Sequence, residues 1–107
     1  MKVLFLVQSC NQERYIKEEQ IIRETWGKYI RKNCDLYFYR GWADITIVDG
    51  DVILIKCDDS LNGTFLKTLY AFQIFSEYDY DFIVRSNTST YINVDLLLNT
   101  LYQQKVL

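Results

Sequence analysis

An almost unbroken apolar run near the start of the chain, Val3 to Gln8, most restricts the folds that this sequence can adopt. A strand whose successive residues are all apolar buries both of its faces, and such strands lie inside parallel sheets covered by helices. Leu36 to Tyr39 predicts a second strand, and Phe82 to Val84 predicts a third, also buried. The first run is too short to span a membrane and ends in polar residues, so we interpret it as a strand and not as a secretion signal.

Two segments between these strands have the apolar periodicity of helices. The first, 18–31, places Ile22, Trp26 and Ile30 on one face, with Trp26 expected in the core. The second, 62–77, is apolar on more than one side, which predicts a helix packed deeply against the sheet. A further helix is expected after Asn93, a suitable N-cap residue.

A turn at 49–51, Asp-Gly-Asp, separates Ile45–Val48 from Val52–Ile55. It can close a hairpin or lead into the next strand, and the sequence leaves both possibilities open. Strands near 2–8, 35–40, 51–56 and 81–86 therefore alternate with helices. This pattern predicts an α/β fold over residues 1–107, a single domain with one mostly parallel sheet and helices on both faces.

Composition excludes several classes of function. Twelve basic and fourteen acidic residues give a net charge of −2 without long runs of either sign, which argues against nucleic acid or an anionic membrane as partner. The chain has no histidine, which removes histidine-based acid–base chemistry. The three cysteines, Cys10, Cys34 and Cys57, are too scattered for a disulfide framework or a zinc site. We expect free thiols in a reducing compartment and, with no signal or membrane span, a cytoplasmic protein.

Three stretches of the sequence stand out: 22–26, the motifs between residues 50 and 68, and 84–93. Together they resemble motifs of the β-1,3-glycosyltransferases of the galactosyltransferase and Fringe type. The segment 22–26, Ile-Arg-Glu-Thr-Trp, resembles the I-R-x-T-W motif of that family. Residues 50–53, followed by Asp59-Ser60 and by 66–68, resemble its G-D-I-I, D-S-Y and L-K-T motifs at matching spacing. Val84 to Asn93 resembles its strand and metal-binding loop.

The resemblance implies a GT-A fold, which is Rossmann-like, with this chain as its N-terminal nucleotide-binding half, truncated relative to a full glycosyltransferase. It implies a hexosyltransferase that binds a UDP-hexose donor and transfers the hexose with inversion to a glycan acceptor. UDP is expected and not a dinucleotide, because no glycine-rich phosphate fingerprint follows the first strand. The implied nucleotide-binding residues are Gln8, Ser9, Arg23, Asp59 and Arg85, and the implied diphosphate-sugar loop is Ser86, Asn87, Thr88 and Ser89.

Gln8, Ser9 and the segment 86–89 lie at the ends of predicted strands. In open α/β sheets, ligands bind just beyond the carboxyl ends of the strands, so the strands ending near Ser9 and Ser86 are expected to converge on one cleft. No catalytic residue is assigned, because the family's general base belongs to an acceptor half that has no counterpart in this sequence.

The loop departs from the family in its charge. Asn87, Thr88 and Ser89 stand where the family has three aspartates, with Asn87 and Ser89 at the positions of its metal ligands. The family uses Mn²⁺ or Mg²⁺, hard cations that prefer carboxylate oxygens. We therefore predict no metal-ligand set and weak metal dependence, with the guanidinium of Arg85 meeting the diphosphate instead.

Each of these residues also has a purely structural interpretation. Arg23 can form a surface ion pair with Glu19 one turn away, and Lys67 can extend along its helix to the solvent. Residues 87–89 can form a polar turn, and residues 58–59 an acidic turn that leads into a helix. Arg85 can form an ion pair with Asp81 or Asp95. Two further functions stay open: a non-catalytic relative that still binds nucleotide, and a small α/β interaction module.

Overall fold

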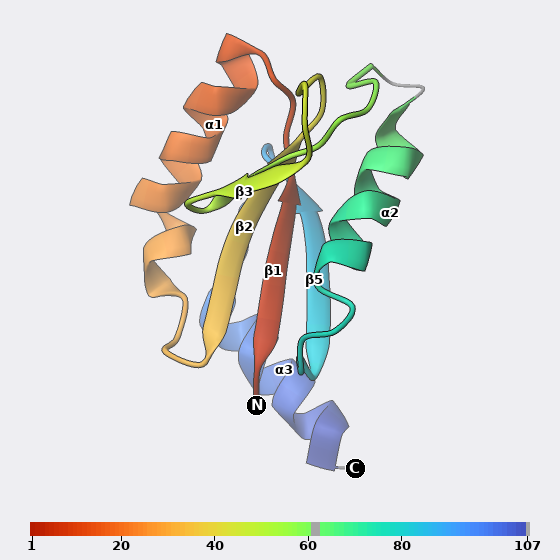
Figure 1. The fold of residues 1–107 in the computed structure, drawn as a ribbon. Coiled ribbons are helices and arrows are strands. Elements are labelled where there is room, and N and C mark those ends of the chain that lie inside the picture. The colour runs from red at the N-terminus through yellow and green to blue at the C-terminus, as the bar shows by residue number, and fades with distance from the viewer. Residues whose placement is uncertain (61–62, 107) are drawn as a thin grey trace.

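The computed structural model describes residues 1–60 and 63–106 (Figure 1). Strands and helices alternate along most of the chain. In chain order the elements are β1 (Val3–Gln8), α1 (Glu13–Glu24), the 3₁₀ helix η1 (Trp26–Tyr29), β2 (Cys34–Arg40), β3 (Ile47–Asp49), β4 (Val52–Leu54), α2 (Thr64–Ile74), β5 (Phe82–Asn87) and α3 (Val94–Val106).

The strands form one five-stranded sheet in the order β3-β4-β2-β1-β5. β1 pairs in parallel with β2 on one side and with β5 on the other, and β2 pairs in parallel with β4. β3 is antiparallel to β4 and completes the hairpin that the sequence left open. Gly50 makes that turn with a φ of 62°, in the left-handed region that glycine enters without a steric penalty. The predicted α/β class and mostly parallel sheet are confirmed.

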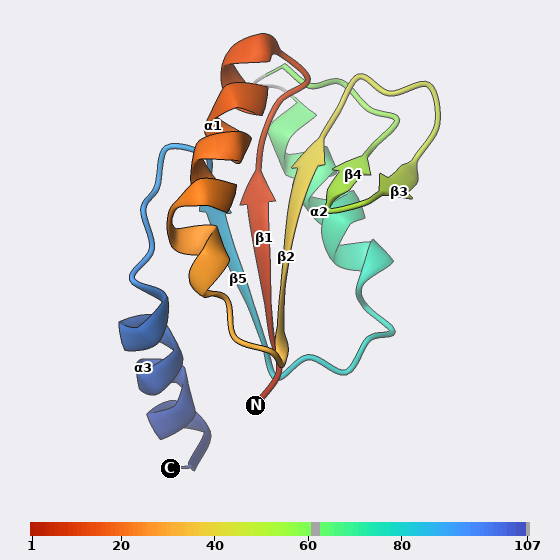
Figure 2. The same cartoon turned by 90° about the vertical axis from the view of Figure 1, so that its left-hand side faces the viewer.

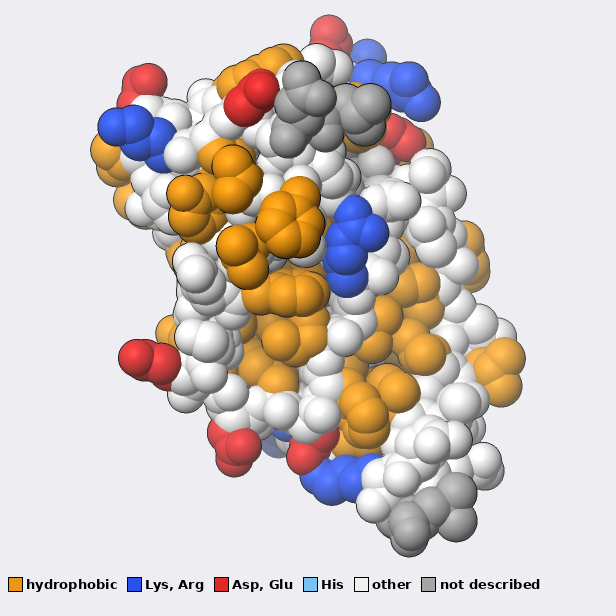
Figure 3. Space-filling view, turned by 90° about the vertical axis from the view of Figure 1, so that its right-hand side faces the viewer, with side chains coloured by type: hydrophobic (Ala, Val, Ile, Leu, Met, Phe, Trp, Pro, Cys, Tyr) orange, Lys and Arg blue, Asp and Glu red, His pale blue; other side chains and the backbone are white. Residues whose placement is uncertain are grey.

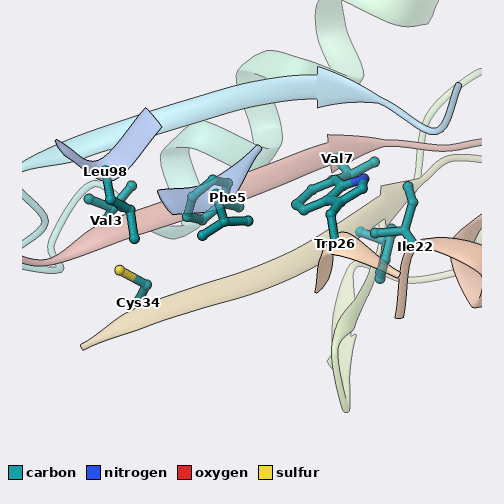
Figure 4. Close-up of a cluster of buried hydrophobic side chains, with 9 residues drawn as sticks. Val3, Phe5, Val7, Ile22, Trp26, Cys34 and Leu98 are labelled. Atoms are coloured by element: carbon teal, nitrogen blue, oxygen red, sulfur yellow. The ribbon is translucent and has the colours of Figure 1, made fainter. Parts of the chain in front are cut away.

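β1 lies inside the sheet, between β2 and β5, and the five residues from Val3 to Val7 are completely buried, as predicted. Its odd-numbered side chains pack with α1, η1 and α3, as Figure 4 shows for Phe5, Ile22 and Trp26. The rings of Phe5 and Trp26 lie 6.1 Å apart, and only 1% of Trp26 is exposed, so its predicted place in the core is confirmed.

The even-numbered side chains of β1 face α2. Leu4 and Leu6 form a second cluster with Tyr39, Ile53, Ile55, Ala71 and Phe75. Figure 2 shows α1 and α3 on one side of the sheet and α2 on the other, so the prediction of helices on both faces is confirmed.

The expectation that the second helix is packed deeply is wrong. α2 contacts the sheet through Lys67 and Ala71, whereas its outer side remains in solvent. The exposed residues on that side are Phe65 at 76%, with Leu66, Leu69, Tyr70 and Phe72. Figure 3, which views the side of the molecule carrying α2, shows apolar side chains gathered on this surface.

β5 is also less buried than its apolar sequence predicted. It pairs with β1 alone among the strands described, so it forms an edge of the sheet. Its side chains alternate between half-buried and exposed, and Ile83 is 40% exposed on the face that carries α2. Ile83 is exposed because α2 does not cover β5: the buried side chains of α2 pack with β1, β2 and β4 instead.

The helix bounds differ from the predicted ones. α1 begins five residues before the predicted Glu18, where polar side chains hide its start from apolar periodicity. It ends at Glu24, because Thr25 leaves the helical conformation and η1 continues the apolar face through Trp26. The predicted start of α2 at residue 62 lies outside the described residues. In the structure α2 ends at Ile74, before the predicted end at residue 77. Asn93 caps α3 as predicted: its Oδ1 accepts from the backbone N–H of Leu96 at 3.1 Å.

Across residues 1–60 and 63–106, the structure has no helix with the length and apolarity needed to cross a membrane.

Candidate functional site

A cleft of about 510 Å³ opens beyond the carboxyl ends of β1, β2 and β5, at the top of the sheet in Figure 1. The sequence-predicted residues that it brings together are Gln8, Ser9, Asp59, Asn87, Thr88 and Ser89. The strands ending near Ser9 and Ser86 thus converge on one cleft, as expected. The residues that sequence reasoning missed are Cys10, Gln12, Arg14, Tyr15, Glu18, Trp42 and Thr64, with Ser60 noted only within a motif.

A buried ion pair forms the floor of this cleft. The Lys67 ammonium donates to Asp59 Oδ1 at 2.5 Å and to the carbonyl oxygen of Ser9 at 2.6 Å, and neither charged side chain is exposed. Asp59 Oδ2 accepts from the backbone N–H of Asn11 at 2.5 Å. The expectation that Lys67 extends to the solvent is therefore wrong. Its charge instead joins α2 to the chain segment that leaves β1.

A second buried carboxylate holds the same segment from the other side. Glu19 on α1 is completely buried, accepts from Ser9 Oγ at 2.5 Å and pairs with the Arg40 guanidinium at 2.7 and 2.5 Å. Ser9 is thus fixed through its side chain by α1 and through its carbonyl by α2. Buried charges require such partners, since an unpaired one is costly to desolvate.

Arg23 lies outside the cleft lining. Its guanidinium makes a two-pronged contact with Asp51 at 2.7 and 2.9 Å and approaches Glu19 at 3.5 Å. The hydrogen bonds to Asp51 raise the pKa of Arg23 above its ordinary value. The predicted pairing with Glu19 exists, but Glu19 is buried, so this is not the surface ion pair that the spacing indicated.

Arg85 sits beside the cleft without lining it. It donates to Gln8 Oε1 and, at 3.2 Å, to the Tyr39 hydroxyl, both of which are neutral acceptors. The alternative pairing with Asp81 or Asp95 is wrong, because Asp81 pairs with Lys105 and Asp95 with Arg31.

The loop 87–89 is a turn that carries polar side chains into the cleft. The Thr90 N–H donates to the Asn87 carbonyl at 3.1 Å, and the buried Thr88 donates to Glu18 Oε1 at 3.3 Å. Ser86 belongs to β5, beside its register partner Val7, and is not among the residues that line the cleft. Its Oγ is buried and has no hydrogen-bond partner among the described residues.

Charge in the cleft is balanced. Arg14 lies 3.8 Å from Glu18, and its side chain is 79% exposed. Burial raises the pKa of the Cys10 thiol, which keeps it protonated at neutral pH although Lys67 lies 3.8 Å away. Hydrogen bonds from Ser60 lower the pKa of Asp58. The turn 58–60 therefore combines a buried aspartate, Asp59, with an exposed one, Asp58.

The donor set does not fit a hard divalent cation. Within the part of the chain that the structure describes, no three Asp, Glu, His or Cys side chains gather as a metal site. Both carboxylate oxygens of Asp59 are already engaged by Lys67 and Asn11, and the 87–89 loop offers amide and hydroxyl oxygens alone. We derive no step through a metal ion.

Comparison of this chain with protein-family models, with curated proteins and with solved structures gives no match. The fold itself gives the class of protein: an α/β protein with a mostly parallel sheet and a polar cleft at the carboxyl ends of its strands.

Proposed function

We propose that this chain binds a nucleotide-sugar of the UDP-hexose type, as the donor-binding part of a GT-A glycosyltransferase. One observation supports the proposal above the others. Gln8–Ser9, Asp59–Ser60 and Asn87–Ser89 lie far apart in the sequence and line a single cleft at the carboxyl edge of the sheet. That edge is where open α/β sheets bind nucleotides. Asp59–Ser60 belongs to a motif that resembles the family, and Asn87–Ser89 occupies the positions of the family's three aspartates.

The diphosphate is met by protein cations in this proposal. Arg85 donates to neutral oxygens and pairs with no carboxylate in the described residues, so its charge remains available beside Gln8. Arg14 lines the cleft and approaches Glu18 through its Nε at 3.8 Å, so its two outer nitrogens form no ion pair within the described residues. Guanidinium groups suit this role because their N–H fork matches two phosphate oxygens.

The chain's own residues would then orient the donor. Asn87 and Ser89 can hydrogen-bond the sugar or its diphosphate, and Lys67 and Glu19 keep the β1 exit rigid through Ser9. Inverting transfer to a glycan acceptor also needs a general base, and we assign that role to no residue of this chain. Nucleotide-sugar binding without turnover is the second candidate, favoured by the 87–89 loop, which lacks a carboxylate.

Isothermal titration calorimetry with UDP, UDP-glucose and UDP-galactose tests the proposal, with and without Mn²⁺. We expect saturable binding at or below millimolar nucleotide, with little dependence on Mn²⁺. Asn87→Ala and Arg85→Ala should each weaken binding, roughly tenfold for the loss of one charge-assisted or well-placed hydrogen bond.

Asn33→Ala is the matched control, because Asn33 is an exposed asparagine in a different pocket, remote from the carboxyl edge. It should bind UDP as the wild type does. Absence of binding by the wild type at millimolar UDP and UDP-hexoses refutes the proposal. Equal binding by wild type and Arg85→Ala refutes the part assigned to Arg85. Turnover of a UDP-hexose in the presence of glycan acceptors separates the enzyme from the non-catalytic binder.

A further inference from the structure

Trp42 has an unusual backbone for its position in the cleft. It lies two residues beyond the end of β2, after Gly41, and its φ of 53° places it in the left-handed region, where it is the one non-glycine residue among those described. Bulky side chains rarely adopt this conformation, and such residues persist where the surrounding structure holds them, often at ligand sites. The indole is 48% exposed and lines the cleft.

Several contacts hold this residue in place. Its backbone N–H donates to the Cys57 carbonyl at 2.8 Å, and its indole N–H donates to Asp58 Oδ1 at 3.2 Å. The preceding Gly41 packs so tightly that a Cβ there would lie 2.8 Å from the Cβ of Asp59. Hydrogen bonds of the indole N–H and of the backbone N–H therefore fix Trp42 next to the buried Asp59–Lys67 pair.

The indole of Trp42 is half-exposed and has no aromatic or cationic neighbour among the described residues. No aromatic or cationic group of residues 1–60 and 63–106 stacks on Trp42. The other aromatic residue of the cleft, Tyr15, has the Arg14 guanidinium 5.5 Å from its ring centroid. The second tryptophan, Trp26, is buried in the core. Trp42 thus presents a half-exposed aromatic surface to this cleft, with no ring or cation of the described residues stacked on it.

The cleft has two chemically different ends. Trp42 follows β2, whereas the amide and hydroxyl side chains of 87–89 follow β5, and β1 lies between these strands. Two strand spacings amount to about 10 Å. A ligand that fits both ends has a planar ring at one end and a polar, hydrogen-bonding group at the other.

We infer that the indole face of Trp42 is the stacking surface for the base of the bound nucleotide, with the diphosphate extending past Ser9 toward Asn87. The inference rests on the proposed function and adds the orientation of the ligand. Stacking on an aromatic side chain accounts for a large part of base affinity at other nucleotide-binding surfaces. Asp58 fixes the ring, so little side-chain entropy is lost when the base binds.

The test compares UDP with pyrophosphate, which lacks the base, in calorimetric titrations of the full chain. Trp42→Ala should weaken UDP binding about tenfold or more and leave pyrophosphate binding unchanged. Trp42→Phe, which keeps an aromatic face, should bind UDP within about threefold of the wild type. UDP should quench the tryptophan fluorescence of the wild type but not of Trp42→Phe, because Trp26 is buried.

Tyr102→Ala is the control, because Tyr102 is an exposed aromatic residue on α3, outside the cleft. It should leave both affinities unchanged. If Trp42→Ala binds UDP as tightly as the wild type, or loses UDP and pyrophosphate in equal proportion, the stacking role is refuted while nucleotide binding stands. If the wild type binds no UDP or UDP-hexose, the proposed function and this inference both fail.

Discussion

Replacing Lys67 by methionine tests the central energetic claim about the cleft floor. Methionine has nearly the length and volume of lysine but cannot donate, so Asp59 keeps one partner, the Asn11 N–H, and the Ser9 carbonyl loses a charged donor. Removing one member of a completely buried ion pair costs about 3–5 kcal/mol, because the remaining charge is neither solvated nor neutralised. Domains of this size are stable by about 5–15 kcal/mol, so Lys67→Met should lose a large part of the total.

The assay is urea unfolding followed by circular dichroism, with the double variant Asp59→Asn/Lys67→Met completing the comparison. We expect the double variant to be more stable than Lys67→Met, because the buried charge has been removed from both sides. Lys105→Met is the control, since Lys105 pairs with Asp81 at the surface and its loss should have a far smaller effect. A stability of Lys67→Met within about 1 kcal/mol of the wild type would refute the reasoning, as would strictly additive effects of the two changes.

Three further predictions concern other parts of the fold. Gly50→Ala should lower the free energy of unfolding by about 1 kcal/mol, and Gly50→Asn by less, because φ is 62° and no atom lies within 4 Å of the added Cβ; urea unfolding that ranks alanine equal to glycine contradicts this. Glu19→Gln should cost about 3 kcal/mol in the same assay by leaving Arg40 without its buried countercharge, whereas Glu13→Gln at the surface should change little. Hydrogen bonds from Lys105 and the Lys2 N–H lower the pKa of Asp81 below its ordinary 3.8, so its stabilisation is present above that pH and is lost as the pH falls through the folded-state value. Asp81→Asn should therefore show a shallower loss of stability below pH 4 in acid unfolding, and an unchanged acid limb would contradict this assignment.

Most of the architecture could be predicted because the apolar runs of β1 and β2 are recognisable in the sequence itself. A run buried on both faces leaves few arrangements other than a parallel sheet between helix layers. The edge position of β5 could not be predicted in this way, because its apolar start resembles that of a central strand. Where a strand lies in the sheet depends on which strands pair with it and on where α2 packs, and neither is a local property.

The cleft was predicted in part, through residues that directly follow β1 and β5. Lys67 shows why the rest escaped prediction. Helical periodicity places it on the inner side of α2, but burial of an ammonium depends on Asp59 and on a carbonyl 58 residues away in the chain. Trp42 escaped prediction for a related reason, since its positive φ depends on contacts with Cys57 and Asp58 that are distant in the sequence. Gly41, which ends the predicted strand just before it, was the one local signal of a turn.

The register of β1 has a consequence for how the chain folds. One edge of β1 pairs with β2, and its other edge pairs with β5, which comes much later in the chain: Val3 aligns with Phe82, and the Asp81 N–H donates to the Lys2 carbonyl at 2.8 Å. During synthesis, β1 therefore keeps one open edge until β5 has emerged from the ribosome. Before β5 emerges, α2 has already been synthesised, and the apolar residues on its outer side are exposed to solvent. Such non-local closure slows folding and favours association between nascent chains, so we expect the yield of native protein to depend on chaperones that shield apolar segments.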